Sequence, residues 1–223
     1  ELTGALIGLA HAVGEDKAEL ETDRLMMESL FATLTNVNFD DESLKKQIEA
    51  VHQEKEKYVP GCISCQEPCG RTTDYSMKKL WEDEEDIRSL KSLLLFGLRG
   101  TAAYACHAMV LGYTDEQVNA FFYKGMAAIG EDRDMEKLLP LVMEAGAVNL
   151  KCMELLDKAN TETYGIPAPA KVEMKVEKGP FIVISGHDLR DLKLLLEQTE
   201  GRGINIYTHG EMLPAHAYPE LRR

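Results

Sequence analysis

Two side chains of types that commonly bind metals follow short apolar runs near the end of the chain. His187 comes three positions after the run 181–184, and Glu211 comes four positions after the run 204–207. Ligands of open parallel sheets bind beyond the carboxyl ends of the strands. If the two runs are neighbouring strands, both side chains reach one crevice, where an imidazole and a carboxylate could bind a metal ion. The alternative is that His187 and Asp188 form a turn and a helix cap, while Glu211 is a solvated loop carboxylate.

A second set of potential ligands is the C-x₂-C-x₃-C pattern of Cys62, Cys65 and Cys69, in the irregular stretch 60–73. Three thiolates need a fourth ligand to close a tetrahedral site. His52 is a candidate only if the end of its helix folds back toward the loop. Free thiols or an adventitious disulfide explain the pattern more simply than a metal site does.

The remaining cysteines, Cys106 and Cys152, fall inside helical patterns, where a free thiol is usually a small buried hydrophobe. An odd total of five cysteines and the lack of a secretory signal favour a reducing, cytoplasmic location. The helical pattern is already running at Leu2 and the first residue is Glu1, so we expect the true start to lie upstream.

Charge excludes two classes of partner. The chain has 25 basic and 38 acidic residues, a net charge of −13. Nucleic-acid binding depends on neutralising phosphates with Lys and Arg, so we expect no nucleic-acid partner. An anionic membrane surface is disfavoured for the same reason, and no apolar run is long enough to span a membrane.

The elements that position these residues are mostly helical. Apolar residues at three-and-four spacing predict helices over 1–13, 17–34, 41–57, 84–112, from about 115 to Gly130, and from Asp134 to about 160. Antiparallel helices with short turns form bundles, and we expect two three-helix bundles here.

Three local details of these helices are open to test. Gly97 and Gly100, with Ala102 and Ala103, leave little side chain on the long helix, so another helix could approach closely there. Thr114 and Gln117 have the spacing of a capping box. Pro140 should kink the last helix or delay its start by a turn.

The architecture changes after residue 164. Glycine and prolines at 165–171 predict a linker. The strand-like runs 181–184 and 204–207 flank a helical pattern, with Asp188 as its cap. This is a βαβ unit with parallel strands. We therefore predict a mainly α protein, with a helical-bundle domain over 1–164 followed at 165–223 by the truncated start of an α/β, Rossmann-like domain.

Long motifs resemble a known family. The segment ISGHDLRDLKLLLEQTEGRGINIYTHGEMLPAHAYPEL (184–221) is similar to the part of hybrid-cluster (prismane) proteins, the hydroxylamine reductase family, that enters their cluster-binding region. The stretches FATLTNVNFD (31–40), LLLFGLRGTAAYACHAMVLGY (93–113) and NLKCMELLDKANTETYG (149–165) resemble the same family. The similarity covers essentially the whole chain.

The resemblance implies a site and an activity. The family histidine of the SGHDL motif falls on His187, and one family glutamate, in HGEMLPAH, falls on Glu211. Both would be ligands of a hybrid iron–sulfur–oxygen cluster. The family reduces hydroxylamine to ammonia, and nitric oxide reduction is also attributed to it, so a small-molecule substrate and a redox partner protein are implied. His209 and His216 flank the glutamate and could orient it or pass a proton, although ordinary loop roles are the simpler reading.

The chain also departs from the family. The short cysteine-rich opening that holds a conventional iron–sulfur cluster is missing from these 223 residues, as is the later region with the cluster cysteines and a further glutamate. The intact protein would carry both clusters, whereas we expect this chain alone to hold none and to be inactive. Two rival readings are a non-catalytic helical packing module and the related carbon monoxide dehydrogenase class; the HGEMLPAH stretch favours the hydroxylamine reductase branch.

Overall fold

The computed structural model describes residues 1–14, 17–34, 40–59 and 74–222. They form a mainly helical protein with a small parallel sheet. The chain divides into two compact units: Glu1–Cys106 with Thr114–Leu155, and His107–Tyr113 with Leu156–Arg223. No helix within the described ranges is long and apolar enough to cross a membrane.

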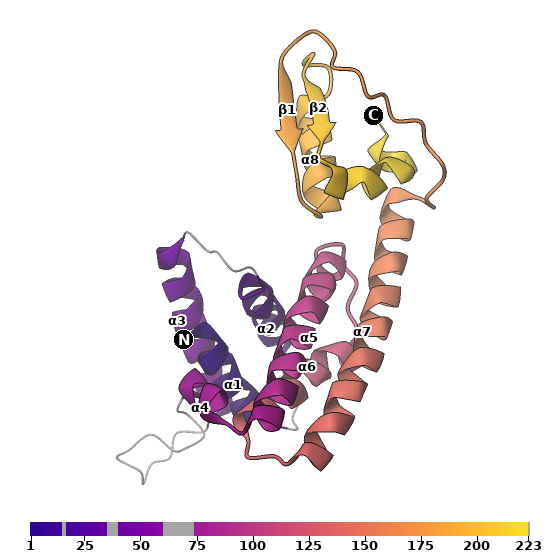
Figure 1. Cartoon of the computed structure of the whole chain (residues 1–223). Coiled ribbons are helices and arrows are strands. Elements are labelled where there is room, and N and C mark those ends of the chain that lie inside the picture. The colour runs from indigo at the N-terminus through magenta and orange to yellow at the C-terminus, as the bar shows by residue number, and fades with distance from the viewer. Residues whose placement is uncertain (15–16, 35–39, 60–73, 223) are drawn as a thin grey trace. The chain divides into compact units, whose positions relative to one another are not determined.

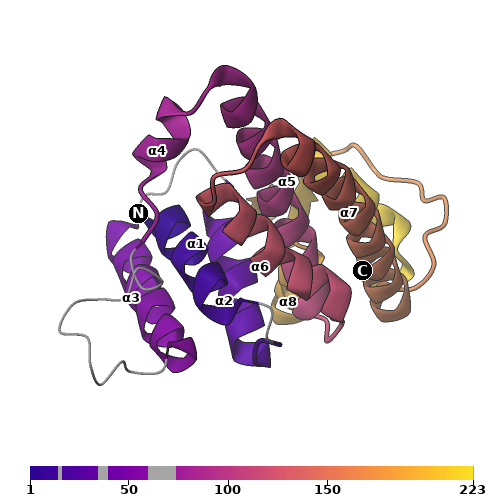
Figure 2. The ribbon, with the colours of Figure 1, turned by 90° about the horizontal axis from the view of Figure 1, so that it is seen from below.

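The first unit is built from helices. They are α1 (Leu2–Val13), α2 (Leu20–Ala32), α3 (Asp41–Tyr58), α4 (Met77–Glu82), α5 (Glu85–Met109), α6 (Glu116–Gly130) and α7 (Met135–Tyr164), and the ends of α5 and α7 belong to the second unit (Figure 1). Helix α1 is the centre of this unit because its residues from Leu2 to Ala10 are all buried. It packs between α3 and α6 (Figure 2).

One predicted helix start needs correction, and for another start one of two alternatives is excluded. Helix α6 is capped by Asp115, whose Oδ1 accepts hydrogen bonds from the backbone N–H groups of Gln117 and Val118 at 2.9 and 3.1 Å. The capping box of Thr114 and Gln117 is therefore wrong, because the aspartate one position later is a stronger cap. Helix α7 starts at Met135, before Pro140, so the proline does not delay its start.

The site of close helix approach also differs from the expectation. A Cβ atom placed on Gly97 or Gly100 would meet nothing within 4 Å among the residues that the structure describes, so neither glycine is a point of close contact there. The close approach lies instead at Gly125 of α6, where a Cβ would come within 2.8 Å of Leu98 Cδ1. The prediction therefore fails at the two glycines, whereas Ala102 and Ala103 are buried, because small residues permit close packing but do not say whether a neighbour is present.

The second unit contains the sheet. Its elements are β1 (Phe181–Ile184), α8 (Leu189–Thr199), β2 (Asn205–Thr208) and two 3₁₀ segments, η1 (Gly210–Ala217) and η2 (Pro219–Leu221). The strands are parallel, with Phe181 opposite Asn205 and Ile184 opposite Thr208, which confirms the predicted strand direction. The second strand begins one residue later than predicted. A buried cluster of Tyr164, Leu192, Met212, Ala215 and Leu221 forms the core of this unit.

Candidate metal centre

The two candidate ligands leave the same edge of the sheet. Both strands point toward the edge where η1 runs (Figure 1). The backbone N–H of His209 donates to the Ile184 carbonyl at 2.8 Å, which continues the strand pairing by one step. The loop after β1 then turns through Gly186, whose φ of 130° is in the region that favours glycine. His187 follows this turn, and Glu211 lies in the first turn of η1.

The structure brings His187 and Glu211 together. The Nε2 atom of His187 lies 3.8 Å from Oε2 of Glu211, and the two side chains are 73% and 53% exposed. Two ligands bound at about 2.1 Å to one tetrahedral ion are about 3.4 Å apart. Small rotations of these exposed side chains would reach that spacing, so the pair fits two positions of a metal centre that is open on its other sides.

The neighbouring histidines are held by hydroxyl groups. Ser185 Oγ lies 3.1 Å from His209 Nδ1, and Thr208 Oγ1 lies 2.8 Å from His216 Nε2. The first of these hydrogen bonds joins the loop after β1 to the loop after β2. His209 therefore ties together the two loops that carry the ligand pair, in keeping with a loop role rather than a direct contact with the glutamate.

Asp188 is the predicted cap of α8 and also has a partner that sequence reasoning missed. Its Oδ1 accepts a hydrogen bond from the Asp191 N–H at 2.9 Å, which confirms the cap. Its Oδ2 lies 3.6 Å from Nδ1 of His107, near the end of α5. No local pattern could have revealed this pair, because the two residues belong to elements far apart along the chain.

A buried tyrosine packs against the neighbour of Glu211 and against the helix that follows His187. Tyr164 is 1% exposed and packs with Leu192 of α8 and Met212, the neighbour of Glu211. Burial, with a smaller effect of the Asp188 charge, raises the pKa of the Tyr164 hydroxyl to about 12. The phenol is therefore neutral at physiological pH and acts here as a packing group under the site.

The cysteines fall into two groups. Cys106 and Cys152 are buried as predicted, and burial raises the pKa of each thiol to about 12. Cys62, Cys65 and Cys69 lie outside the described residues. His52, considered as their partner, has its Nε2 2.8 Å from Asp74 Oδ2. Among the residues that the structure describes, no three or more His, Cys, Asp or Glu side chains gather as a metal site.

Comparison with known proteins identifies the class. The chain belongs to the Prismane/CO dehydrogenase family, which it matches over residues 1–223. It is 48% identical over 244 residues to the hydroxylamine reductase of Solidesulfovibrio magneticus, covering 100% of this chain and 45% of that protein. It is 45% identical over 245 residues to the hydroxylamine reductase of Thermodesulfovibrio yellowstonii, covering 100% and 46%. It is 43% identical over 221 residues to the hydroxylamine reductase of Chlorobaculum tepidum, covering 94% of this chain and 41% of that protein.

These figures confirm the family resemblance seen in the sequence motifs. They also show that the chain spans less than half the length of the curated relatives it matches.

Proposed function

We propose that this chain is part of an iron–sulfur oxidoreductase that reduces hydroxylamine to ammonia, and that His187 and Glu211 are ligands of its hybrid cluster. The observation that carries the proposal is the 3.8 Å separation of His187 Nε2 and Glu211 Oε2 at the carboxyl ends of two paired parallel strands. The names of the relatives support the reaction, since the curated proteins that match the chain at 48% and 45% identity are called hydroxylamine reductases.

The donor types of the pair suit this chemistry. Thiolates match sulfide-bridged iron, whereas imidazole and carboxylate match harder, more labile iron positions. When bound, the cluster supplies the two electrons that, with two protons, convert hydroxylamine into ammonia and water. The exposure of both side chains leaves the pair accessible to a small substrate. In this proposal the chain's own contribution is to hold two ligands on a fixed sheet edge.

The experiment replaces each ligand in the complete protein. Glu211→Gln removes the anionic oxygen while nearly keeping the shape, and His187→Ala removes the imidazole. We expect both variants to change the visible and electron paramagnetic resonance spectra of the anaerobically purified protein, to lower its iron content and to slow hydroxylamine reduction. Glu220→Gln is the matched control, because Glu220 is an exposed carboxylate in η2 of the same unit.

The same measurements decide between the proposal and its rivals. If both ligand variants kept full spectra and full turnover, the assignment of His187 and Glu211 would be wrong. Assays with nitric oxide and carbon monoxide in parallel test the second substrate and the carbon monoxide dehydrogenase reading. A complete protein that binds no iron would favour the non-catalytic packing module.

The proposal also covers the parts that the complete protein would add. We place a conventional iron–sulfur cluster, the cluster cysteines and the surface for a redox partner outside these 223 residues, with the protein in the cytoplasm. The chain alone, with two cluster ligands among its described residues, should bind no hybrid cluster and reduce no hydroxylamine. Stoichiometric iron and sulfide in the isolated chain would contradict this part of the proposal.

We keep the predicted domain division as part of the proposal: a helical domain over 1–164, and the start of a Rossmann-like domain over 165–223, with a linker at about 165–171. Within the helical domain we propose two three-helix bundles, α1–α3 and α5–α7. A recurrence of helix positions supports this. Helix α1 ends at Val13 and α5 at Met109, and α2 begins at Leu20 and α6 at Glu116, so both pairs are 96 residues apart.

A further inference from the structure

The 96-residue recurrence makes positions of α1 and α5 comparable. It pairs Gly4 with Gly100 and Thr3 with Arg99. Both glycines lie inside their helices, each nine residues before the helix end at Val13 or Met109. If a chain segment covers Gly4 but none covers Gly100, then the helices around α5 lack a segment that the helices around α1 have.

Gly4 is covered by an extended piece of chain. The Tyr75 N–H donates to the Gly4 carbonyl at 3.1 Å, and a Cβ on Gly4 would clash with the Tyr75 carbonyl oxygen. Asp74, the preceding residue, pairs with Lys55 of α3 at 2.8 Å. An acidic, extended segment thus passes over the glycine of α1 and fixes its carboxylate on a neighbouring cation.

Within the described part of the chain, Gly100 has no such cover, and the neighbouring Arg99 has no acidic partner. A Cβ on Gly100 would meet nothing within 4 Å. Arg99 is partly buried, donates through Nη2 to Thr3 Oγ1 at 3.2 Å and lies over the Phe96 ring at 5.4 Å. Its Nε is buried with no acceptor among the described residues, and no carboxylate of that set pairs with it. The two buried lysines of this unit, Lys55 and Lys91, each face an aspartate at 2.8 Å.

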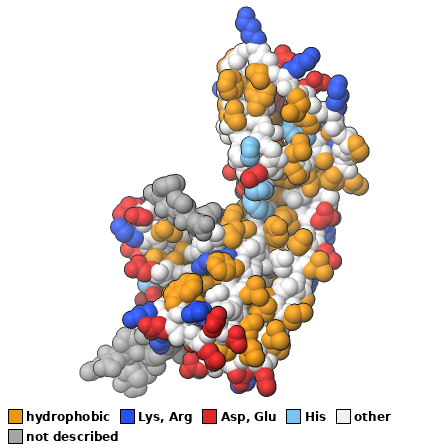
Figure 3. All heavy atoms as spheres, in the orientation of Figure 1, with side chains coloured by type: hydrophobic (Ala, Val, Ile, Leu, Met, Phe, Trp, Pro, Cys, Tyr) orange, Lys and Arg blue, Asp and Glu red, His pale blue; other side chains and the backbone are white. Residues whose placement is uncertain are grey.

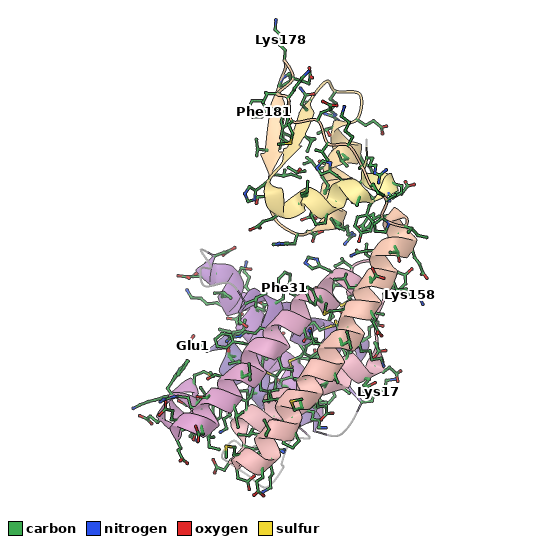
Figure 4. The ribbon with its side chains drawn as sticks, turned by 45° about the vertical axis from the view of Figure 1, so that its right-hand side comes forward. Glu1, Lys17, Phe31, Lys158, Lys178 and Phe181 are labelled. Atoms are coloured by element: carbon green, nitrogen blue, oxygen red, sulfur yellow. The ribbon has the colours of Figure 1, made fainter. Side chains whose placement is uncertain are left out.

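The surface around Gly100 is apolar. Helices α5 and α7 lie side by side, joined by the hydrogen bond of Thr101 to Asn149 at 3.0 Å (Figure 4). Large exposed apolar side chains follow one stripe of each helix, and hydrophobic side chains gather on this part of the surface (Figure 3). The stripes consist of Leu93, Phe96 and Tyr104 on α5 and Leu139, Met143, Leu150 and Met153 on α7. Exposed contiguous apolar surface of this kind marks an interaction site.

We propose that the α5–α7 face is covered by an extended acidic segment of the complete protein, which passes over Gly100 and places a carboxylate on Arg99. The length available for such a segment is large, since the matched relatives are more than twice as long as the part this chain spans. The Arg99 guanidinium, which has no acidic partner among the described residues, requires a carboxylate on the covering segment. The exposed apolar side chains beside it require apolar side chains on that segment. The inference does not depend on the proposed reaction.

The test compares the 223-residue chain with the complete protein, using the two glycines as a matched pair. Gly4→Ala should lower the melting temperature of both proteins, because the new Cβ meets the Tyr75 backbone in each. Gly100→Ala should leave the melting temperature of the 223-residue chain unchanged or raised, because alanine favours an exposed helix. In the complete protein it should lower the melting temperature, as Gly4→Ala does.

Arg99 provides a second readout. Labelling with phenylglyoxal, followed by mass spectrometry, should modify Arg99 in the 223-residue chain and at least tenfold more slowly in the complete protein. Arg99→Met should not lower the melting temperature of the 223-residue chain, since it removes a desolvated charge without an acidic partner, but should lower that of the complete protein.

Two results would overturn the proposal. One is a complete protein in which Gly100→Ala is harmless and Arg99 is labelled as fast as in the 223-residue chain. The other is a 223-residue chain that sediments as a dimer with Arg99 protected, because the occupant would then be a second copy. Neither result bears on whether His187 and Glu211 bind iron.

Discussion

Tyr123 on α6 donates its hydroxyl hydrogen bond to Asp23 Oδ1 on α2 at 2.9 Å. Asn119, one turn earlier on α6, donates to the other carboxylate oxygen at 2.9 Å. The two donors join the helices through a single half-buried acid. Burial raises the pKa of the Asp23 carboxyl despite both hydrogen bonds.

The raised pKa of Asp23 predicts a pH dependence of stability. A carboxyl whose pKa is higher in the folded state contributes stability fully below its unfolded-state pKa, about 3.9. That contribution is lost as the pH rises through the folded-state value. We therefore compare the free energy of unfolding of Asp23→Asn with that of the native chain. The difference should favour the variant more at pH 7 than at pH 3.5. Urea unfolding at the two pH values measures this; an equal effect at both would contradict it. Glu197→Gln, at an exposed position of α8, is the control.

The ion pair of Lys91 and Asp83 predicts an asymmetric response to mutation. Lys91 is 2% exposed, and its Nζ donates to Asp83 Oδ2 at 2.8 Å. Asp83→Ala leaves a buried ammonium without its carboxylate and should reduce the free energy of unfolding by about 3 kcal/mol, whereas Lys91→Met should cost less. Chemical denaturation compares the two. Glu42→Gln breaks the exposed pair with Lys45 and should cost under about 1 kcal/mol.

Gly125 predicts a packing penalty where α6 meets α5. A Cβ there would lie 2.8 Å from Leu98 Cδ1, so the leucine must shift. Gly125→Ala should lower the free energy of unfolding by about 1–3 kcal/mol. In the 223-residue chain, Gly146→Ala on α7 meets nothing within 4 Å and should stabilise by about 0.5–1 kcal/mol. Equal unfolding midpoints for the two variants would refute the close contact.

The burial of Cys106 and Cys152 predicts that their thiols react slowly with alkylating reagents. With pKa values of about 12, Cys106 and Cys152 are thiolates in about one molecule in 10⁴ at pH 8. Maleimide labelling of the folded chain, read by mass spectrometry, should leave both unmodified on a timescale that labels them fully in urea. Fast labelling of either in the folded chain would show that it is not buried.

The parts that were predictable from sequence were those controlled by local pattern. The strand 181–184 and the Asp188 cap are where the apolar run and the helical pattern after it place them, and the parallel direction follows from the intervening helix. Helix α7 was predicted to end near 160 and extends to Tyr164, because its last turn carries the tyrosine that packs into the core of the second unit.

The parts that were not predictable depend on contacts between distant segments. Gly97 and Gly100 have the same local chemistry as a close-packed glycine, and only the arrangement of helices shows that Gly125 has that role. The partner of Asp188 is likewise set by packing, since His107 belongs to another helix. The closeness of His187 and Glu211 was predictable because both follow strands of one βαβ unit; their role as ligands came from the family resemblance and remains a prediction.

The short connection between β1 and β2 has a consequence for biosynthesis. The strands pair Phe181 with Asn205, so the loop that must close is short and is largely filled by α8. Loops of this length close at small entropic cost, and chains fold from the amino-terminal side as they leave the ribosome. The imidazole of His187 and the carboxylate of Glu211 can thus come together once the first turn of η1, which follows β2, has been synthesised. Any ligand supplied from elsewhere would then arrive at a pair already in place.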